Sequence, residues 1–399
     1  MRFLFTRESW GWGIVSRESR VPDMKLALLL FDYFPYGGLQ RGCFMVAEEA
    51  ARRGHTINIF TSTWTGDRPR GAEVGVLGRG GWSNIGRNKS FFSRWQARRS
   101  GTTFDGVIGF NKMPGLDIYY ASDSCYAARI QRLKPVWYRW LSRYRHFHAW
   151  EEAVFRRGGA THVLALAETE IPLYRQHYDT EAERFHLLPP GIVRRTESDA
   201  DQARIRETFR AASGWKSEDK ILLLVGSGFR TKGLDRAIRG LEALSPALRE
   251  KTRLVVVGDD RADGYRWLAG RHDVGDRVEF AGGRPNVYEY LCAADLLVHP
   301  AYAENTGNVL LEAMTAGLPV LASGTCGFAG HVQKAGAGKI VGSNESFSQE
   351  EFNRVLTEML SSKNRGEWSR GGLNYAATAD LYSRREKAVD LIERLVSRK

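Results

Sequence analysis

Two glutamates, Glu304 and Glu312, bracket a turn that could bind an anion. The apolar run at residues 296–298 predicts a buried strand before the turn. The helical spacing of the apolar residues at 309–314 predicts a helix that begins near Gly307. Free N–H groups at a helix start attract anions, and glycine allows a phosphate to approach closely. A phosphate held between two carboxylates that bind hydroxyl groups is the outline of a nucleotide-sugar site.

The second half of the chain supplies the elements that would position these residues. Short apolar runs alternate there with helical patterns, which predicts a parallel, doubly wound sheet. The predicted strands are residues 221–225, 254–257, 278–280, 296–298 and 320–321.

The first half opens in a similar way. Residues 26–31 predict a buried strand, and a glycine-rich loop and a helix ending near Gly54 follow it. The pair Gly37 and Gly38 fits either a close backbone approach to a diphosphate or sugar, or a plain tight turn. Residues 55–62 predict the second strand, and a further buried strand is predicted at residues 107–110, with polar residues at its carboxyl end.

The composition favours a two-domain globular protein with an anionic partner. At 399 residues the chain exceeds one ordinary core, and no apolar run approaches the roughly 20 residues of a membrane span. The four cysteines lie far apart without the spacing of metal ligands, which suits free thiols in a reducing cytosol. The net charge of +12 indicates nucleic acid, a membrane surface or a phosphorylated substrate.

Two stretches fall outside the strand pattern. We interpret residues 1–23 as an N-terminal extension that is disordered or precedes the natural start at Met24. Prolines, glycine and charges at residues 189–201 predict a linker between domains. Asp199 and Asp201 form an Asp-x-Asp in this linker with no strand before it, so we interpret them as solvated charge.

A longer motif surrounds the two glutamates. After Glu312 come Ala313 and residues 316–320, which read Ala-Gly-Leu-Pro-Val. The segment from Glu304 onward resembles the retaining glycosyltransferases of family 4. The resemblance implies the α/β GT-B fold, in which two Rossmann-like domains with doubly wound parallel sheets face each other across a cleft. The expected parts are an acceptor domain at residues 24–190, a UDP-sugar domain at 191–375 and a C-terminal helix at 376–399 that packs back on the first domain.

Three segments of the first half, at residues 34–41, 109–117 and 142–146, make the resemblance more specific. They resemble one branch of the family, the lipopolysaccharide core glucosyltransferases I. This implies a hexosyltransferase that moves glucose from UDP-glucose to the first branch heptose of the lipopolysaccharide inner core, carried on lipid A. It also implies a cytoplasmic enzyme, peripheral on the cytoplasmic face of the inner membrane, with no nucleic acid as partner.

The resemblance assigns the charge on the donor diphosphate to a basic pair. Lys232 matches the lysine of that pair, while the position of the usual arginine holds Thr231. Arg230, Arg194 or Arg195 could supply the missing cation. A solvated lysine at a helix start is the alternative for Lys232.

Further roles follow from the resemblance. Glu312 is expected to accept both ribose hydroxyls, Glu304 to hold glucose hydroxyls, and Asp117 to orient or deprotonate the acceptor. No second carboxylate suits a nucleophile, which favours front-face attack with phosphate as base. Neither a metal nor a cofactor is expected. Backbone groups complete the predicted donor site: Gly38, Gly307, Asn308, Val309 and Leu310.

Residues 126–157 interleave arginines with aromatic residues. Such a pattern fits an anionic membrane surface, stacking against nucleic acid, or a helix pair with buried rings and solvated charges. An anionic glycolipid acceptor favours the membrane over nucleic acid. The predicted membrane-binding residues are Arg129, Arg132, Lys134, Trp137, Arg139, Trp140 and Arg143.

Other readings of the chain remain open. A glycosyltransferase of the same fold could use a different donor or acceptor. A nucleotide-dependent oxidoreductase or epimerase would want Gly-x-Gly-x-x-Gly after the first strand, where only Gly37 and Gly38 occur. A basic membrane- or nucleic-acid-binding protein without transferase activity would explain the net charge, but not the placement of Lys232, Glu304 and Glu312 at strand ends.

Overall fold

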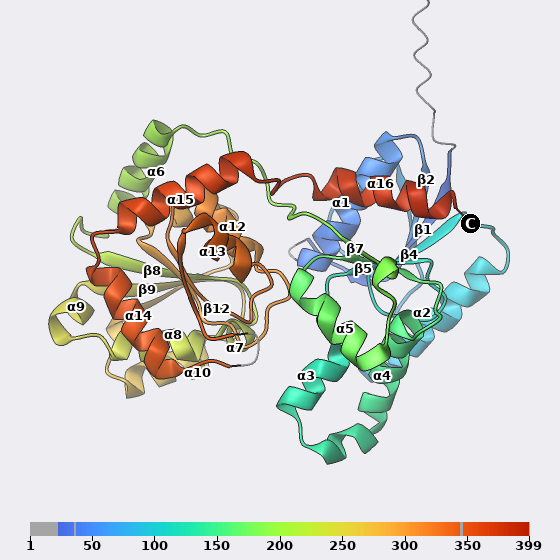
Figure 1. Ribbon diagram of the computed structural model, residues 1–399, viewed down its shortest axis with the longest axis horizontal. Coiled ribbons are helices and arrows are strands. Elements are labelled where there is room, and N and C mark those ends of the chain that lie inside the picture. The colour runs from blue at the N-terminus through green and yellow to red at the C-terminus, as the bar shows by residue number, and fades with distance from the viewer. Residues whose placement is uncertain (1–22, 36, 344–345, 399) are drawn as a thin grey trace, which may run out of the picture.

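The computed structural model describes residues 23–35, 37–343 and 346–398. They form two lobes that lie side by side, each built around a parallel sheet (Figure 1). The prediction for residues 1–23 falls outside the described residues, apart from the exposed Asp23. No helix within the described ranges has the length and apolar character needed to cross a membrane.

The first lobe contains, among the described residues, seven strands in the order β3-β2-β1-β4-β5-β6-β7. Both faces of this sheet are buried, because alternate residues of β1 enter two different cores: Leu26 and Leu28 pack toward α1, and Ala27 and Leu29 toward α2 and α4. The strands are β1 (Lys25–Tyr33), β2 (Thr56–Trp64), β3 (Ala72–Val76), β4 (Gly106–Gly109), β5 (Ile118–Ala121), β6 (His162–Ala165) and β7 (Phe185–Leu187). The helices are α1 (Gly38–Arg52), α2 (Asn84–Arg99), α3 (Tyr126–Leu133), η1 (Val136–Trp140), α4 (Ser142–Phe155), η2 (Glu168–Glu170), α5 (Ile171–Tyr178) and η3 (Ala182–Arg184).

The second lobe repeats the scheme with six described strands in the order β10-β9-β8-β11-β12-β13. Its strands are β8 (Lys220–Val225), β9 (Thr252–Val257), β10 (Val278–Gly282), β11 (Leu296–His299), β12 (Val320–Ser323) and β13 (Gly338–Val341). Its helices are α6 (Asp199–Ala212), α7 (Phe229–Lys232), α8 (Leu234–Glu242), α9 (Pro246–Glu250), α10 (Asp263–Arg271), η4 (Gly275–Arg277), α11 (Val287–Ala293), α12 (Asn308–Thr315), α13 (Ala329–Ala335), α14 (Gln349–Ser361) and α15 (Arg365–Thr378). The predicted doubly wound parallel sheet is confirmed.

Both sheets reverse their strand order beside their first strand, between β1 and β4 and between β8 and β11. Successive crossovers run to opposite sides at such a switch point, which leaves a crevice at the carboxyl ends of the two strands. The topology therefore brings together the loops after β8 and β11, although about 70 residues of sequence separate them. The loops after β1 and β4 meet in the same way.

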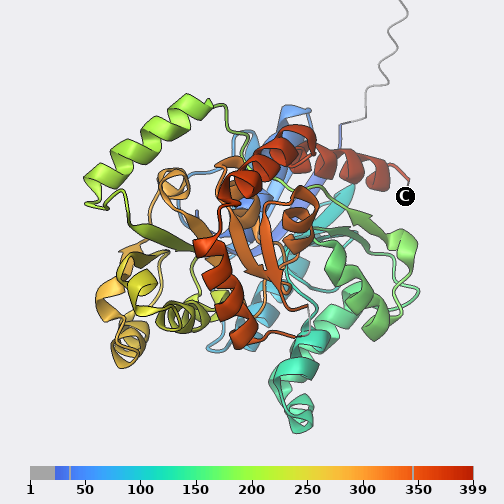
Figure 2. The same cartoon turned by 60° about the vertical axis from the view of Figure 1, so that its left-hand side comes forward.

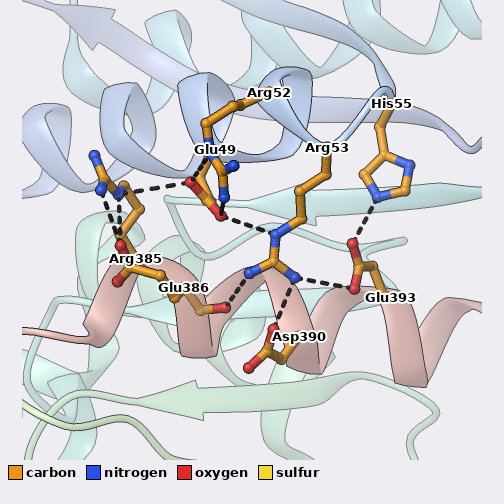
Figure 3. Close-up of polar contacts among 8 residues, drawn as sticks. All are labelled: Glu49, Arg52, Arg53, His55, Arg385, Glu386, Asp390 and Glu393. Carbon is orange, nitrogen blue, oxygen red and sulfur yellow. Dashed lines mark hydrogen bonds and ion pairs between the residues drawn. The ribbon is translucent and has the colours of Figure 1, made fainter. Parts of the chain in front are cut away.

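The last helix, α16 (Arg384–Val396), returns to the first lobe (Figure 1). Its apolar residues, among them Val389 and Ile392, join the core beneath α1. Figure 3 shows the ion pairs along this contact: Arg53 binds Asp390 at 2.7 Å and Glu393 at 3.1 Å, and His55 Nε2 lies 2.9 Å from Glu393. Helix α16, which follows the second domain in sequence, therefore packs against the first domain.

The linker between the lobes ends in a capped helix. Ser198 accepts from the Asp201 N–H, and the Asp201 carboxylate bonds the Ser198 N–H in return. These bonds satisfy the backbone at the start of α6. Asp199 and Asp201 thus lie in the first turn of a helix, where acidic residues are electrostatically favoured.

Candidate active site at the domain cleft

A cavity of about 580 Å³ lies between the lobes, at the carboxyl ends of strands from both sheets. Its walls come from both switch points. The first domain contributes Asp32, Asn111 and Lys112, and the second contributes Thr231, Lys232 and Glu304. The site thus has the position that the topology predicts for a ligand.

The centre of the second domain's wall is an ion pair between Lys232 and Glu304. Glu304 also lies 3.4 Å from Nε2 of His299, the last residue of β11, which is fully buried. Burial lowers the pKa of His299, so its ring is neutral and donates its Nε2–H to the carboxylate. Burial raises the pKa of Glu304, but the hydrogen bond from His299 and the charge of Lys232 outweigh it and bring the pKa to about 2. Glu304 is therefore ionised and held rigidly.

Glycines make the turn that carries Lys232 possible. Gly233 ends α7 in a left-handed conformation, and a Cβ there would lie 2.0 Å from the Pro300 carbonyl oxygen. Only glycine permits such an approach. The Tyr302 N–H donates to the Thr231 carbonyl at 2.8 Å, which ties the same two loops together. The contact fixes Lys232 opposite Glu304.

The loop after β11 also contacts the first domain. The Asn305 amide donates to the carbonyls of Ala121 at 3.2 Å and Ser122 at 2.5 Å, at the carboxyl end of β5. Arg132 of α3 donates to the Tyr302 carbonyl at 3.3 Å. One loop thus positions Glu304 and joins the two domains, a role of Asn305 that its type alone does not reveal.

Glu312 occupies a different environment from Glu304. It lies in the second turn of α12, and among the described residues its carboxylate has no hydrogen bond or ion pair with protein. Burial raises its pKa, while the charges of Arg41 and Arg195 act in the opposite direction. Arg41 belongs to the first turn of α1, so α1 faces Glu312 across the cleft. An unpaired carboxylate here is free to accept hydroxyl groups.

The start of α12 matches the predicted anion site in part. Gly307 precedes the helix in a left-handed conformation, and within the described ranges the N–H groups of Asn308 and Val309 contact no protein acceptor. The Oδ1 atom of Asn308 is buried without a partner among these residues. The prediction for Leu310 is wrong, because its N–H already donates to the Gly307 carbonyl at 3.0 Å.

The positions of Gly38 and Arg230 bear on two other donor predictions. Gly38 opens α1 at the carboxyl end of β1, and a Cβ there would meet nothing within 4 Å, so the space beside it is open. Arg230 is exposed and close enough to Tyr265 to influence its pKa, and among the described residues it is not part of the cavity wall. Arg195 lies near Glu312 instead, stacked 4.3 Å from the Tyr288 ring.

The expected role of Asp117 is wrong. Its carboxylate accepts from the Val107 N–H at 2.8 Å, and its own N–H donates to the Val107 carbonyl. Asp117 immediately precedes β5, while Val107 lies near the start of β4. Both residues therefore lie at the amino ends of the strands, whereas the cleft lies at their carboxyl ends. Asp117 fixes strand pairing and cannot reach an acceptor.

The basic and aromatic segment forms a projection at the edge of the first domain, made of α3, η1 and the start of α4 (Figure 2). Its tip exposes Val136, Trp137 and Trp140 at 75%, 57% and 74%. Lys134 and Arg139 are exposed beside them. The alternative of a helix pair with all rings buried does not fit this tip.

Three of the seven residues predicted to bind a membrane face elsewhere. Arg132 reaches the second domain, and Arg129 and Arg143 line the cleft cavity. The cause is helical geometry, because residues three or four apart on α3 and α4 share the face that is turned to the cleft. The outward set is reduced to Lys134, Trp137, Arg139 and Trp140.

The side chains offer little to a metal ion. Within the described ranges, no group of three or more His, Cys, Asp or Glu residues has an arrangement that could hold one. The cations at the cleft instead suit a ligand that carries phosphate.

Comparisons with known proteins agree with this geometry. The family model of glycosyl transferases group 1 matches residues 205–372. The lipopolysaccharide glucosyltransferase WaaG of Escherichia coli K12 is 43% identical over 370 residues, which cover 92% of this chain and 98% of WaaG. A crystal structure of WaaG superposes with a TM-score of 0.87 and covers 92% of this chain and 99% of that one.

A more distant structure shares the architecture. Alr3699/HepE of Anabaena, solved in complex with UDP-glucose, has a TM-score of 0.70 at 17% identity and covers 93% of this chain and 100% of that one. At that identity the likeness shows the fold alone. Together with the two observed sheets, these comparisons confirm the expected GT-B fold.

Proposed function

Because the chain belongs to the family of the lipopolysaccharide glucosyltransferase WaaG and is therefore a glycosyltransferase, we propose that it transfers glucose from UDP-glucose to the first branch heptose of the lipopolysaccharide inner core. The identity across nearly all of WaaG supports an acceptor of the same class. The observation that carries the proposal is the convergence of Lys232, Glu304 and Glu312 at the β8–β11 switch point.

Each of the three side chains has a distinct task toward the donor. Glu312, which is partly buried and has no ion pair among the described residues, accepts hydrogen bonds from the two ribose hydroxyls. Glu304, ionised and fixed by His299, accepts hydroxyls of the transferred glucose. Lys232 and the N–H groups of Asn308 and Val309 stabilise the charge that grows on the departing diphosphate. Preorganised donors of this kind contribute on the order of 3 kcal/mol each to transition-state stabilisation.

The charge state of Glu304 bears on the stereochemical course. A carboxylate that is ion-paired with Lys232 and hydrogen-bonded to His299 is a poor nucleophile. Asp117, which the sequence predicts near the acceptor, lies at the amino ends of β4 and β5, away from the cleft. We therefore favour front-face attack with retention, in which the departing phosphate takes the proton of the acceptor hydroxyl.

The reaction needs no metal ion in this proposal, since lysine and backbone donors neutralise the diphosphate. Transfer should therefore proceed in the presence of EDTA. Loss of activity in EDTA that Mg²⁺ restores would contradict this part of the mechanism.

The projection at α3, η1 and α4 supports work at a membrane surface. Exposed Trp137 and Trp140 suit the headgroup level, and Lys134 and Arg139 suit anionic lipid. We propose that this tip holds the enzyme peripherally on the cytoplasmic face of the inner membrane, where a lipid-anchored heptose would meet the cleft.

The deciding experiment is transfer assayed with a panel of UDP-sugars and a heptose-containing core acceptor, with product linkage read by NMR. UDP-glucose should give the highest kcat/KM and an α-linked product. Preference for another UDP-sugar would keep the glycosyltransferase and replace the donor. A β-linked product would exclude retention, and transfer to acceptors without heptose would exclude the proposed acceptor.

A further inference from the structure

The cleft wall formed by the first domain has more positive charge than its own carboxylates balance. Arginines come to the cavity from α2, α3 and α4, namely Arg87, Arg129 and Arg143. None of the three has an ion pair with a carboxylate among the described residues; Arg129 and Arg143 lie over the rings of Tyr126 and Phe147. Two carboxylates share this wall: Asp32, which pairs with Arg79 at 3.2 Å, and the exposed Asp123.

Helices α2 and α4 lie parallel and begin at the same cavity. Asn88 contacts His146 at 3.5 Å, and one turn further along both helices the rings of Phe92 and Trp150 lie 5.7 Å apart. Equal steps along the two helices mean that they run in the same direction. Their positive dipole ends therefore lie side by side at the cavity.

The charges at these two helix starts are the reverse of the usual arrangement. Neither α2 nor α4 has an acidic residue in its first turn, and α4 lacks a side-chain cap. Arg87 and Arg143 instead add positive charge where the dipole disfavours it. The neighbouring α3 shows the ordinary solution, because the buried Glu151 accepts from the N–H groups of Tyr126 and Ala127.

Two polar side chains that line this cavity have little or no hydrogen bonding to the described residues. Asn88 is 8% exposed, lines the cavity, and within the described ranges its amide has only the long contact with His146. Ser122 also lines the cavity, and its buried Oγ has no hydrogen-bond partner among those residues. Groups of this kind can bind the hydroxyls of a sugar that enters the cavity.

We infer that the starts of α2 and α4, with Arg87 and Arg143, bind an anionic group of the acceptor, a phosphate or a sugar carboxylate next to the heptose that receives glucose. The inference rests on the proposed function and specifies its acceptor: an acceptor with this charge is preferred over its neutral counterpart. Arg129 borders the same space from α3, and Asn88 and Ser122 bind hydroxyls beside the charge.

The test uses deacylated core oligosaccharide, which removes any contribution from membrane binding. Three forms are compared: the native oligosaccharide, the same after phosphatase, and the same with carboxylates reduced to alcohols. The variant is Arg87→Gln with Arg143→Gln. Its matched control is Lys89→Gln with Arg145→Gln, which removes equal charge from the same helices at exposed residues outside the cavity wall.

The arginine variant should raise the acceptor KM about 10-fold or more, since charge-assisted hydrogen bonds are lost, while the control pair leaves it near wild type. The wild-type enzyme should lose its preference for the native oligosaccharide after one of the two treatments. Phosphatase should abolish it if the group is a phosphate, and reduction should abolish it if the group is a carboxylate. Arg87→Lys with Arg143→Lys should recover part of the affinity. Unchanged UDP-glucose binding verifies that the variants fold.

Equal effects of the two pairs on KM would overturn the inference, as would an arginine effect that is just as large for an oligosaccharide with neither phosphate nor carboxylate. If the wild type transfers no glucose at all, the proposed function fails. In that case calorimetric titration of the native and neutral oligosaccharides still decides whether the anion site exists.

Discussion

The two switch points of this molecule have the same topology but differ in how their positive charges are balanced. Between β8 and β11, the charge of Lys232 is matched by Glu304, which His299 fixes in turn. Between β1 and β4, the adjoining wall carries Arg87 and Arg143 without carboxylate partners among the described residues. The Lys232–Glu304 pair is satisfied within the protein, whereas we propose that a bound anion balances Arg87 and Arg143. The difference suggests how a repeated fold divides its work between donor and acceptor.

The largest effect is expected from breaking the balanced side. Lys232→Ala should lower kcat by about 100- to 1,000-fold, because the charge on the diphosphate is greatest in the transition state. UDP-glucose affinity should fall much less. The measurement is kcat with saturating donor, together with the dissociation constant from calorimetry.

Lys232→Arg is the control, because it keeps the charge and a partner for Glu304. If Lys232→Ala changes affinity and turnover by the same factor, the lysine only positions the donor and the comparison loses its mechanistic meaning.

Glu312 should give the next largest effect. Glu312→Ala should weaken UDP-glucose binding by roughly 1.5–3 kcal/mol, because two hydrogen bonds to a charged acceptor are lost. Calorimetry with UDP-glucose at neutral pH measures this loss. An affinity equal to that of the wild type would rule out the ribose role.

The raised pKa of Glu312 adds a pH dependence of known sign. The carboxylate binds hydroxyls when ionised, so affinity should be full at neutral pH and should fall as the pH drops through a value above the ordinary 4.5. UDP-glucose is the suitable probe because its diphosphate does not titrate in this range. Glu312→Gln should bind weakly at every pH; a variant with the wild-type pH profile would assign the titration to another group.

A smaller effect is expected at the projection. Replacing Trp137 and Trp140 by Ser should lower partitioning onto anionic vesicles about 10-fold, because two amphipathic rings leave the interface. Vesicle sedimentation at several salt concentrations measures it, with attraction weakening as salt rises. Trp267→Ser is the control, since Trp267 is 63% exposed on the second domain. Equal behaviour of all variants would place membrane contact elsewhere.

The smallest effect concerns α16, which lies outside both switch points. Glu393→Gln keeps a hydrogen-bond partner for His55 but removes one charge from the Arg53 cluster in Figure 3, at a cost of about 1 kcal/mol. Amides of α16 should exchange hydrogen several-fold faster, while kcat stays at the wild-type value. A change in kcat as large as that of Lys232→Ala would mean that docking of α16 controls the site.

The site of the second domain could be predicted from sequence because its residues directly follow strands. Glu304 follows a clear apolar run, and α12 begins at Asn308, next to Gly307, as the pattern indicates. The Leu310 N–H does not fit the prediction, because the tight first turn of α12 directs it to the Gly307 carbonyl. The spacing of apolar residues does not encode this local hydrogen bond.

The first domain was harder to predict for two physical reasons. Parallel strands are joined by crossovers, so a residue just before a strand, such as Asp117, lies at the amino edge even when the residues after the previous strand line the cleft. Helix α2 carries only part of the usual start signal, because Ser83 caps it but its first turn has no acidic residue and contains Arg87. The missing acidic residue weakens the start signal and also leaves this helix start suited to an anion.

The division of labour is tested most directly by initial rates measured over a grid of UDP-glucose and core oligosaccharide concentrations. Glu312→Gln should raise the KM for UDP-glucose about 10-fold and leave the acceptor KM unchanged. Arg87→Gln with Arg143→Gln should do the reverse. If both variants raise the same KM, or each raises both equally, the two switch points do not divide donor from acceptor and the account is wrong.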